Sequence, residues 1–189
     1  MTKDKYHHGD LKRVLIAAAL DSLETQDASL ISLRTIAAAV GVSHTAPKNH
    51  FGSLKGLMTA VAVHGHGRLA HQMRTNINPD NARPAQLSAA ATSYLGFATD
   101  TANLYRLMFS SQLIDTGDAA LKDAEAATRD ILRQVSSGLT RHPADKEPAI
   151  DLLLWSILHG YASLVINHQI SENGPMPPFS IETALQDAV

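Results

Sequence analysis

Apolar positions recur with a helical period along nearly the whole chain. Leu11, Val14, Leu15 and Ala18 follow the i, i+3, i+4, i+7 spacing, which predicts a helix over about residues 10–24. The same pattern predicts further helices over about residues 33–40, 54–76, 85–101, 104–113, 119–137 and 148–170, with a terminal turn or two at 181–188. No segment alternates polar and apolar residues as a strand does, and the sequence has no internal repeat. We therefore expect an all-α protein.

A short helix is also expected to end near Phe51, and a proline decides where it begins. If Ser43 caps this helix, Pro47 removes its first intrahelical hydrogen bond. If Thr45 is the cap, Pro47 falls among positions whose N–H groups have no intrahelical partner in any case. We therefore expect the regular helix to start late, and the residues before it to form a tight turn.

The clearest linker is the segment INPDNARP at residues 77–84, which is rich in proline and asparagine. It divides the chain into a first helical domain over residues 1–53, a long connecting helix over 54–77, and a C-terminal helical bundle over 78–189. With 189 residues, the chain is long enough to bury a hydrophobic core without covalent cross-links.

Composition narrows the class of protein further. The chain has no cysteine, which excludes disulfides, thiolate metal sites and a cysteine nucleophile. The first ten residues lack the apolar stretch of a secretion signal, so we expect a cytoplasmic protein. The longest apolar run, residues 152–166, is interrupted by Ser156, His159 and Gly160, and we interpret it as a buried helix rather than a membrane span.

Charge is distributed unevenly along the chain. Residues 1–75 hold nine lysines and arginines against five acidic residues, whereas the remainder holds seven against thirteen. Seven of the ten histidines also lie in residues 1–75. A basic front and an acidic back suggest that only the front meets a polyanion, although an imbalance of this size also arises by chance.

The most specific segment is TIAAAVGVSHTAPKNHF, at residues 35–51. Ser32 can cap its first helix, Gly41 permits a tight turn, and Ile36 and Val42 fill the angle between the helices. The small residues 37–39 suit a close helix crossing. This is the form of a helix-turn-helix, and the alternative is a helical hairpin that merely packs. The second helix offers to a partner the side chains of Ser43, His44, Thr45, Lys48 and Asn49.

Residues 6–66 resemble the N-terminal domain of TetR/AcrR-type transcriptional regulators. The matching segments are YHHGDLKRVLIAAALDSLE, SLRTIAAAVGVS and HTAPKNHFGSLKGLMTAVA. The later segment LLLWSILHGYASLV resembles a subgroup whose regulatory domain carries a Trp–His–Gly signature, here Trp155, His159 and Gly160. The chain departs from the family pattern where Lys48 replaces an aromatic residue, Asn49 replaces a frequent basic residue, and Leu54 replaces a lysine.

The resemblance implies a DNA interface with two kinds of contact. Phosphate contacts position the protein, and we assign them to Ser32, Arg34, Lys48, His50 and Lys55. Base edges would be read by His44, Thr45 and Asn49, with Ser43 beside them and methyl contacts from Thr45 or Ala46. The N-terminal arm, which either enters a minor groove or is disordered, carries Lys3, Lys5, Tyr6, His7 and His8.

The resemblance also implies a C-terminal domain that binds a small hydrophobic effector and dimerises through the last two long helices. The protein would then be a homodimeric repressor, which the effector releases from a palindromic operator in double-stranded DNA at the bacterial nucleoid. The candidate effector-binding residues, each also a plausible core residue, are Tyr94, Phe97, Tyr105, Met108, Phe109, Gln112, Trp155 and His159. The candidate interface residues are Leu153, Ile157, Ala162 and Ile166, with Gly160 permitting close helix approach.

Other functions fit less well. The histidines at 7, 8, 64, 66 and 71 lack thiolate or carboxylate companions at ligand spacing, so we interpret them as solvated surface residues and expect no metal or cofactor. Ser163 and His159 lie four residues apart, but no acid or oxyanion hole accompanies them, and an enzyme is not expected. A helical binding module that has lost DNA recognition remains an alternative.

Overall fold

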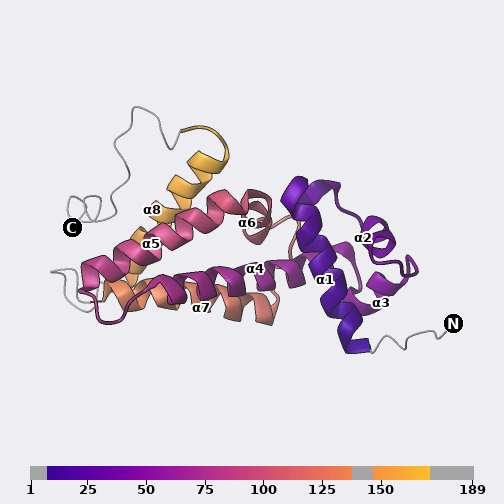
Figure 1. The fold of residues 1–189 in the computed structure, drawn as a ribbon, viewed down its shortest axis with the longest axis horizontal. Coiled ribbons are helices and arrows are strands. Elements are labelled where there is room, and N and C mark those ends of the chain that lie inside the picture. The colour runs from indigo at the N-terminus through magenta and orange to yellow at the C-terminus, as the bar shows by residue number, and fades with distance from the viewer. Residues whose placement is uncertain (1–7, 138–146, 171–189) are drawn as a thin grey trace. The chain divides into compact units, whose positions relative to one another are not determined.

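A computed structural model describes residues 8–137 and 147–170 of the chain. Every regular element in these two ranges is helical and neither contains a strand, which confirms the all-α prediction (Figure 1). The elements are α1 (His8–Thr25), η1 (Ala28–Leu30), α2 (Leu33–Ala39), α3 (Ala46–Phe51), α4 (Leu54–Asn76), α5 (Arg83–Asp100), α6 (Ala102–Met108), α7 (Ala119–Ser136) and α8 (Glu147–Ile166). The turn expected at 181–188 lies outside the described residues.

The chain divides into two compact units. Unit 1 comprises Met1–Gly65 and Asn103–Lys122, and unit 2 comprises His66–Ala102 and Asp123–Val189. The long helix α4 contributes its first half to unit 1 and its second half to unit 2. Unit 1 therefore takes in a segment from the middle of the chain, which the linear pattern of helices does not reveal.

The first part of unit 1 is a three-helix arrangement in which α1, α2 and α3 contact one another (Figure 1). Its core is apolar, with Leu15, Leu23 and Ile36 all buried. The 3-10 helix η1 joins α1 to α2, and sequence reasoning treated this stretch only as a polar break. Asp27 caps η1 by accepting hydrogen bonds from the backbone N–H and the hydroxyl of Ser29, at 2.8 and 2.6 Å.

The second part of unit 1, residues 103–122, is fixed to the first part by hydrogen bonds. The Asn103 side chain donates to the Leu23 carbonyl at 3.0 Å, and the Asp115 N–H donates to the Thr59 hydroxyl at 2.9 Å. The helix expected over 104–113 is too long, because α6 ends at Met108. Residues 110–114 instead form turns in which the Ser110 carbonyl accepts hydrogen bonds from later N–H groups, consistent with the poor helix propensity of serine.

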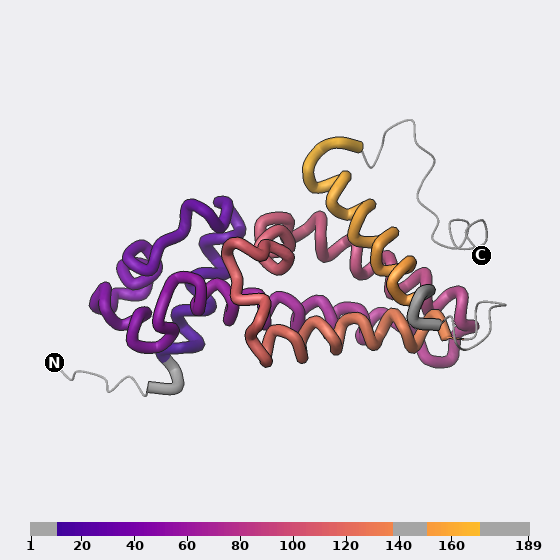
Figure 2. The backbone as a smooth tube through the Cα atoms, turned by 180° about the vertical axis from the view of Figure 1, so that it is seen from behind, coloured from indigo at the N-terminus to yellow at the C-terminus, as the bar shows by residue number. Residues whose placement is uncertain are grey.

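Unit 2 is held by contacts among the second half of α4, α5, α7 and α8. Helices α5 and α8 contact each other (Figure 2). The buried side chains on these two helices include Tyr94, Phe97 and Leu158. Asn76 on α4 donates to the Ser93 hydroxyl on α5 at 2.9 Å. These contacts bury the apolar faces that the helical periodicity identified.

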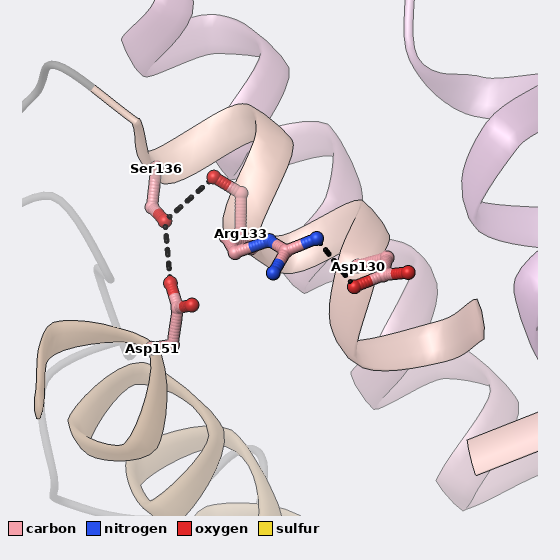
Figure 3. A network of polar contacts seen from close by, with 4 residues as sticks. All are labelled: Asp130, Arg133, Ser136 and Asp151. Carbon is pink, nitrogen blue, oxygen red and sulfur yellow. Dashed lines mark hydrogen bonds and ion pairs between the residues drawn. The ribbon is translucent and has the colours of Figure 1, made fainter. Parts of the chain in front are cut away.

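Polar contacts also join α7 to α8. The Ser136 hydroxyl donates toward the Asp151 carboxylate at 3.4 Å and toward the Arg133 carbonyl at 3.2 Å (Figure 3). Arg133 forms an ion pair with Asp130 at 2.8 Å, one helical turn away (Figure 3). That pair is largely exposed, and exposed pairs contribute little to stability. The Ser136–Asp151 contact links the two helices directly.

Helix α8 corrects part of the expected dimer interface. Ala162 and Ile166 are buried within unit 2, so they belong to the core of a single chain. Leu153 and Ile157 are half-buried. In the described parts of the chain, no helix is both long enough and apolar enough to cross a bilayer.

Candidate nucleic-acid interface

The candidate interface begins at the N-terminus of α2, where Ser32 caps the helix. The Ser32 hydroxyl accepts a hydrogen bond from the Thr35 N–H, and the Thr35 hydroxyl accepts one from the Ser32 N–H, both at 3.1 Å. This reciprocal capping box confirms that Ser32 caps α2, and it satisfies two N–H groups that would otherwise lack partners. Arg34 is exposed in the first turn of α2, where it can reach a phosphate.

The turn after α2 depends on Gly41. Its φ is +70°, a value that other residues rarely adopt, and the Val42 N–H closes the helix end by donating to the Ala37 carbonyl at 3.0 Å. Ala37 is buried, as expected for a close helix contact. Ala38 and Ala39 are exposed, which corrects the expectation that all three alanines lie at a helix crossing. Their exposure follows from the helical period, which turns only one of three successive residues toward the core.

The recognition segment begins with a turn, followed by a short helix. The Ala46 N–H donates to the Ser43 carbonyl at 2.9 Å, and α3 then runs only from Ala46 to Phe51. This confirms the late start predicted from Pro47. Thr45 occupies the cap position but makes no capping hydrogen bond, because its hydroxyl lies 3.0 Å from the hydroxyl of Ser43.

Pro47 also has a role that the sequence reasoning missed. It is buried, so its ring faces the core of unit 1, while Ala46 before it is half-buried and Lys48 after it is exposed. A proline at the second helical position removes no hydrogen bond and fixes φ near the helical value. The residue therefore anchors a six-residue helix that is too short to be stable on its own.

The predicted DNA-binding side chains lie on the exterior of this segment and beside it. Ser43, His44, Thr45, Lys48 and Asn49 are exposed, and Ala46 and His50 are half-buried. Lys55 is exposed in the first turn of α4, whereas Leu54 is half-buried. The arm residues Lys3, Lys5, Tyr6 and His7 lie outside the described residues, as does the side chain of His8.

The helix-turn-helix lies in a stretch of sequence, residues 28–79, whose charge is more uniformly positive than that of residues 1–75 as a whole. Between Asp27 and Asp80 the sequence contains no carboxylate over 52 residues, but it contains five lysines or arginines and five histidines. The stretch covers α2, α3 and α4. A protein surface without carboxylates avoids repulsion from DNA phosphates, and lysines and arginines on it supply salt-dependent affinity.

The candidate effector residues fall into two sets. Tyr94, Phe97, Trp155 and His159 lie in unit 2, whereas Tyr105, Met108, Phe109 and Gln112 lie in unit 1. In the first set, the Tyr94 hydroxyl lies 3.4 Å from His159 Nδ1, and the Trp155 and His159 rings are 5.9 Å apart. The Arg129 guanidinium lies 5.8 Å from the Trp155 ring centroid. Burial lowers the pKa of His159, so its neutral form is favoured.

In the second set, Tyr105 and Met108 are buried and Gln112 is exposed. The Tyr105 and Phe109 ring centroids lie 4.9 Å apart, a distance that is typical of packed aromatic pairs. The eight residues therefore do not form one group within either unit. The separation arises because residues 103–122 fold with unit 1, which the order of elements along the chain gave no reason to expect.

Histidines do not define a metal centre in the described ranges. Histidine, aspartate and glutamate side chains there form no group of three that could hold a metal ion. His64 and His71 are exposed, as expected for surface histidines. His66 is buried, which corrects that interpretation for one of the three. It lies two residues from His64 on α4 and therefore faces the opposite side of the helix.

An exposed, polar helix-turn-helix within a stretch of sequence that lacks carboxylates is typical of one class, the helix-turn-helix DNA-binding proteins. The family model described as "Tetracyclin repressor-like, C-terminal domain" matches residues 87–188, more than half of the chain. The chain therefore belongs to the TetR family of transcriptional regulators. Members of this family regulate transcription, so the protein is a regulator rather than an enzyme.

Solved structures have the same fold. A protein with unknown function from Rhodococcus sp. RHA1 is 28% identical, with a TM-score of 0.78, over 98% of this chain and 96% of that one. A tetR-family regulatory protein from Rhodococcus RHA1 is 22% identical, with a TM-score of 0.62, over 80% and 83% of the two chains. PfmR, a TetR-family regulator from Thermus thermophilus, is 16% identical, with a TM-score of 0.61, over 93% and 95%. None of the curated proteins compared matches the sequence.

Proposed function

We propose that the protein is a homodimeric repressor that reads an inverted-repeat operator through the turn at residues 43–45 and helix α3. The observation that carries this proposal is the exposure of Ser43, His44, Thr45, Lys48 and Asn49 within a stretch of 52 residues that lacks carboxylates. Asn49 pairs with adenine edges through its amide, and Lys48 contacts phosphate in place of the family's aromatic residue. Ser32, Arg34, His50 and Lys55 hold the backbone on either side.

Dimerisation is proposed through α8. Leu152 and Leu164 are 60% and 41% exposed, and Ser156 and Gly160 between them are exposed as well. These four residues are spaced four apart and form a single ridge of the helix, with small residues at its centre. A Cβ added at Gly160 would meet no atom within 4 Å, so the centre of this ridge is open to a second helix. A two-fold dimer would place two recognition helices on two half-sites.

The effector is proposed to bind in the domain over residues 78–189, and the family-model match over residues 87–188 supports this proposal. Within it, Tyr94, Trp155 and His159 combine apolar surface with two polar groups, which suits a largely hydrophobic ligand with one hydrogen-bonding group. An effector that binds one conformation of the protein more tightly than another would change the DNA affinity. The size of this change is set by the difference between the two effector-binding free energies, typically about 1–3 kcal/mol. The long helix α4, over residues 54–76, would connect this domain to the DNA-binding one.

The direct test is selection of binding sites from a random duplex DNA library with the full chain at about 0.15 M salt, where non-specific dissociation constants are roughly 10⁻⁴–10⁻⁶ M. We expect an inverted repeat with half-sites separated by about one helical turn or a multiple of it. Weak binding that disappears as salt rises, with no enriched motif, would contradict the proposal. It would instead favour a helical binding module without specific DNA recognition.

A further inference from the structure

Unit 1 contains a groove whose lining includes two of the proposed phosphate contacts, His50 and Lys55. Its volume is about 640 Å³, which lies within the range of small-molecule sites. The walls come from α1, from the first half of α4 and from the segment before and at the start of α7, all within unit 1. Its apolar lining residues include Ile16, Phe51, Ala60 and Val63.

Part of the groove's lining is basic. Lys12 and Lys55 line the groove together with His50, and the Lys12 ammonium lies 5.8 Å from the centroid of the Phe51 ring. Within the described ranges, neither lysine forms an ion pair with a carboxylate. The groove therefore presents two cationic groups beside apolar surface.

Two carboxylates, Asp115 and Asp118, also line the groove, and each accepts a hydrogen bond within its own turn. Asp115 accepts a hydrogen bond from the Gly117 N–H at 3.0 Å, and Asp118 accepts one from the Leu121 N–H at 2.9 Å. The Asp115 N–H is tied in turn to the Thr59 hydroxyl on the wall of the groove. These carboxylates shape the wall and repel an anion, so the acid group of a ligand is expected at the lysines and not beside Asp115 or Asp118. On α4 the groove runs from Lys55 to about Val63, roughly 12 Å at 1.5 Å per residue.

We propose that this groove binds a small amphipathic carboxylate. The acid group lies at Lys12 and Lys55, and the apolar chain follows Ile16, Ala60 and Val63 along α4. The site differs from the effector site proposed in residues 78–189. Because the ligand uses Lys55, a DNA phosphate and the carboxylate compete for the same lysine, a consequence that rests on the proposed DNA-binding function.

Binding is tested without DNA, so that the result does not depend on the operator. Octanoate is titrated into the full-length ¹⁵N-labelled protein, and backbone amide shifts are followed by NMR. We expect saturable shifts at residues 53–64 and 115–120. Lys12→Met should weaken this binding about three- to fivefold, the scale of one exposed charge contact. Ala60→Phe should abolish the shifts by filling the groove.

Two matched variants and one ligand control complete the test. Lys122→Met is the control for Lys12→Met, because it removes an exposed lysine that does not line the groove. Ala17→Phe is the control for Ala60→Phe, because it adds the same ring at an exposed position on α1. Both control variants should bind octanoate like the wild type. Octan-1-ol, which lacks the charge, should bind more weakly than octanoate. No shifts at these residues, shifts that persist in Ala60→Phe, or equal affinity for octan-1-ol would each overturn the proposal. If the site is confirmed, competition between octanoate and the selected operator then tests the regulatory consequence separately.

Discussion

Adjacent residues on α3 have different expected roles in DNA binding. Lys48 and Asn49 are both exposed and neighbour each other in the chain, but an ammonium contacts a phosphate as a point charge, whereas an amide pairs with one base edge. The two substitutions therefore have distinguishable effects. A change at Lys48 alters affinity for every DNA, and a change at Asn49 alters preference among sequences.

Lys48→Ala should weaken binding to the operator and to unrelated DNA by a similar factor, about three- to tenfold. The slope of log K against log salt should fall by about one, because one fewer counterion is released. Fluorescence anisotropy at several salt concentrations measures both quantities. Lys122→Ala is the matched control, since that exposed lysine lies outside the recognition segment. A loss confined to the operator would show that Lys48 reads a base instead.

A second prediction concerns the pH dependence of stability. The folded pKa of His159 lies below its ordinary value of 6.5 because of burial, so the unfolded chain takes up a proton more readily. The contribution of His159 to stability is therefore present above pH 6.5 and is lost as pH falls below that value. Chemical denaturation from about pH 7.5 to about pH 5.5 should show a smaller loss of stability in His159→Gln than in the wild type. The exposed His71→Gln should behave like the wild type, and an equal slope in all three proteins would contradict the assignment.

At the residue scale, the sequence predicted what depends on local chemistry. The Ser32 cap, the positive φ at Gly41 and the effect of Pro47 were all confirmed, because each follows from the chain within a few residues. The burial of His66 was not predicted, because it depends on which elements pack against α4. That Tyr105 and Tyr94 belong to different units was not predicted for the same reason, since the assignment of residues 103–122 to unit 1 is a tertiary property.

At the scale of elements, the helices with strong periodicity were predicted closely and the short ones less well. The expected helix over 54–76 is α4, whereas η1 was missed and α6 was predicted to be five residues too long, ending at 113 instead of Met108. The short elements are defined by capping and turn hydrogen bonds, such as those of Asp27 and Ser110, more than by apolar spacing. The junction between α3 and α4 is another short segment that apolar spacing does not define, because the chain turns there within a few residues.

Gly56 is essential to that junction. A Cβ at this position would clash with the Phe51 carbonyl oxygen, which is backbone and cannot move aside cheaply. Gly56→Ala should therefore destabilise the protein by about 2 kcal/mol, the scale of an overpacked site. Gly67→Ala is the matched control on the same helix, because a Cβ there meets no atom within 4 Å. This substitution should stabilise the protein by about 0.5–1 kcal/mol, because it removes the conformational penalty of a glycine within a helix. Thermal denaturation measures both, and a neutral Gly56→Ala would show that the junction relaxes easily.

At the scale of the whole molecule, the proposed function requires two chains, because an inverted repeat is read by two copies of α3. The ridge on α8 has leucines at both ends and exposed small residues between them, as expected of a surface that meets its own copy. Sequence reasoning chose α8 as a long apolar helix for this interface, but it selected Ala162 and Ile166, which face the core. Apolar content identifies such a helix, and only the packed structure shows which apolar side chains remain outside.

Leu152→Glu should disrupt the dimer, because it places a charge on a surface that would be desolvated. We expect the dimer dissociation constant to rise at least tenfold, the effect of losing a central apolar contact worth about 1.4 kcal/mol or more. Sedimentation over a range of protein concentrations measures this constant. Leu30→Glu is the matched control, since Leu30 is 69% exposed on η1 and far from α8 in sequence. A wild-type chain that stays monomeric, or a Leu152→Glu dimer of unchanged affinity, would contradict an α8 interface.

The central claim is that the turn at 43–45 and α3 read DNA sequence. The most direct measurement is a parallel selection of binding sites with the wild type and with Asn49→Ala. We expect the wild type to recover an inverted repeat, and the variant to recover the same repeat with one position per half-site no longer specified. Loss of preference at that position should amount to about 1–3 kcal/mol. If Asn49→Ala recovers an unchanged motif, the proposed base contact of Asn49 is contradicted. If neither protein recovers a motif, sequence-specific recognition itself is contradicted.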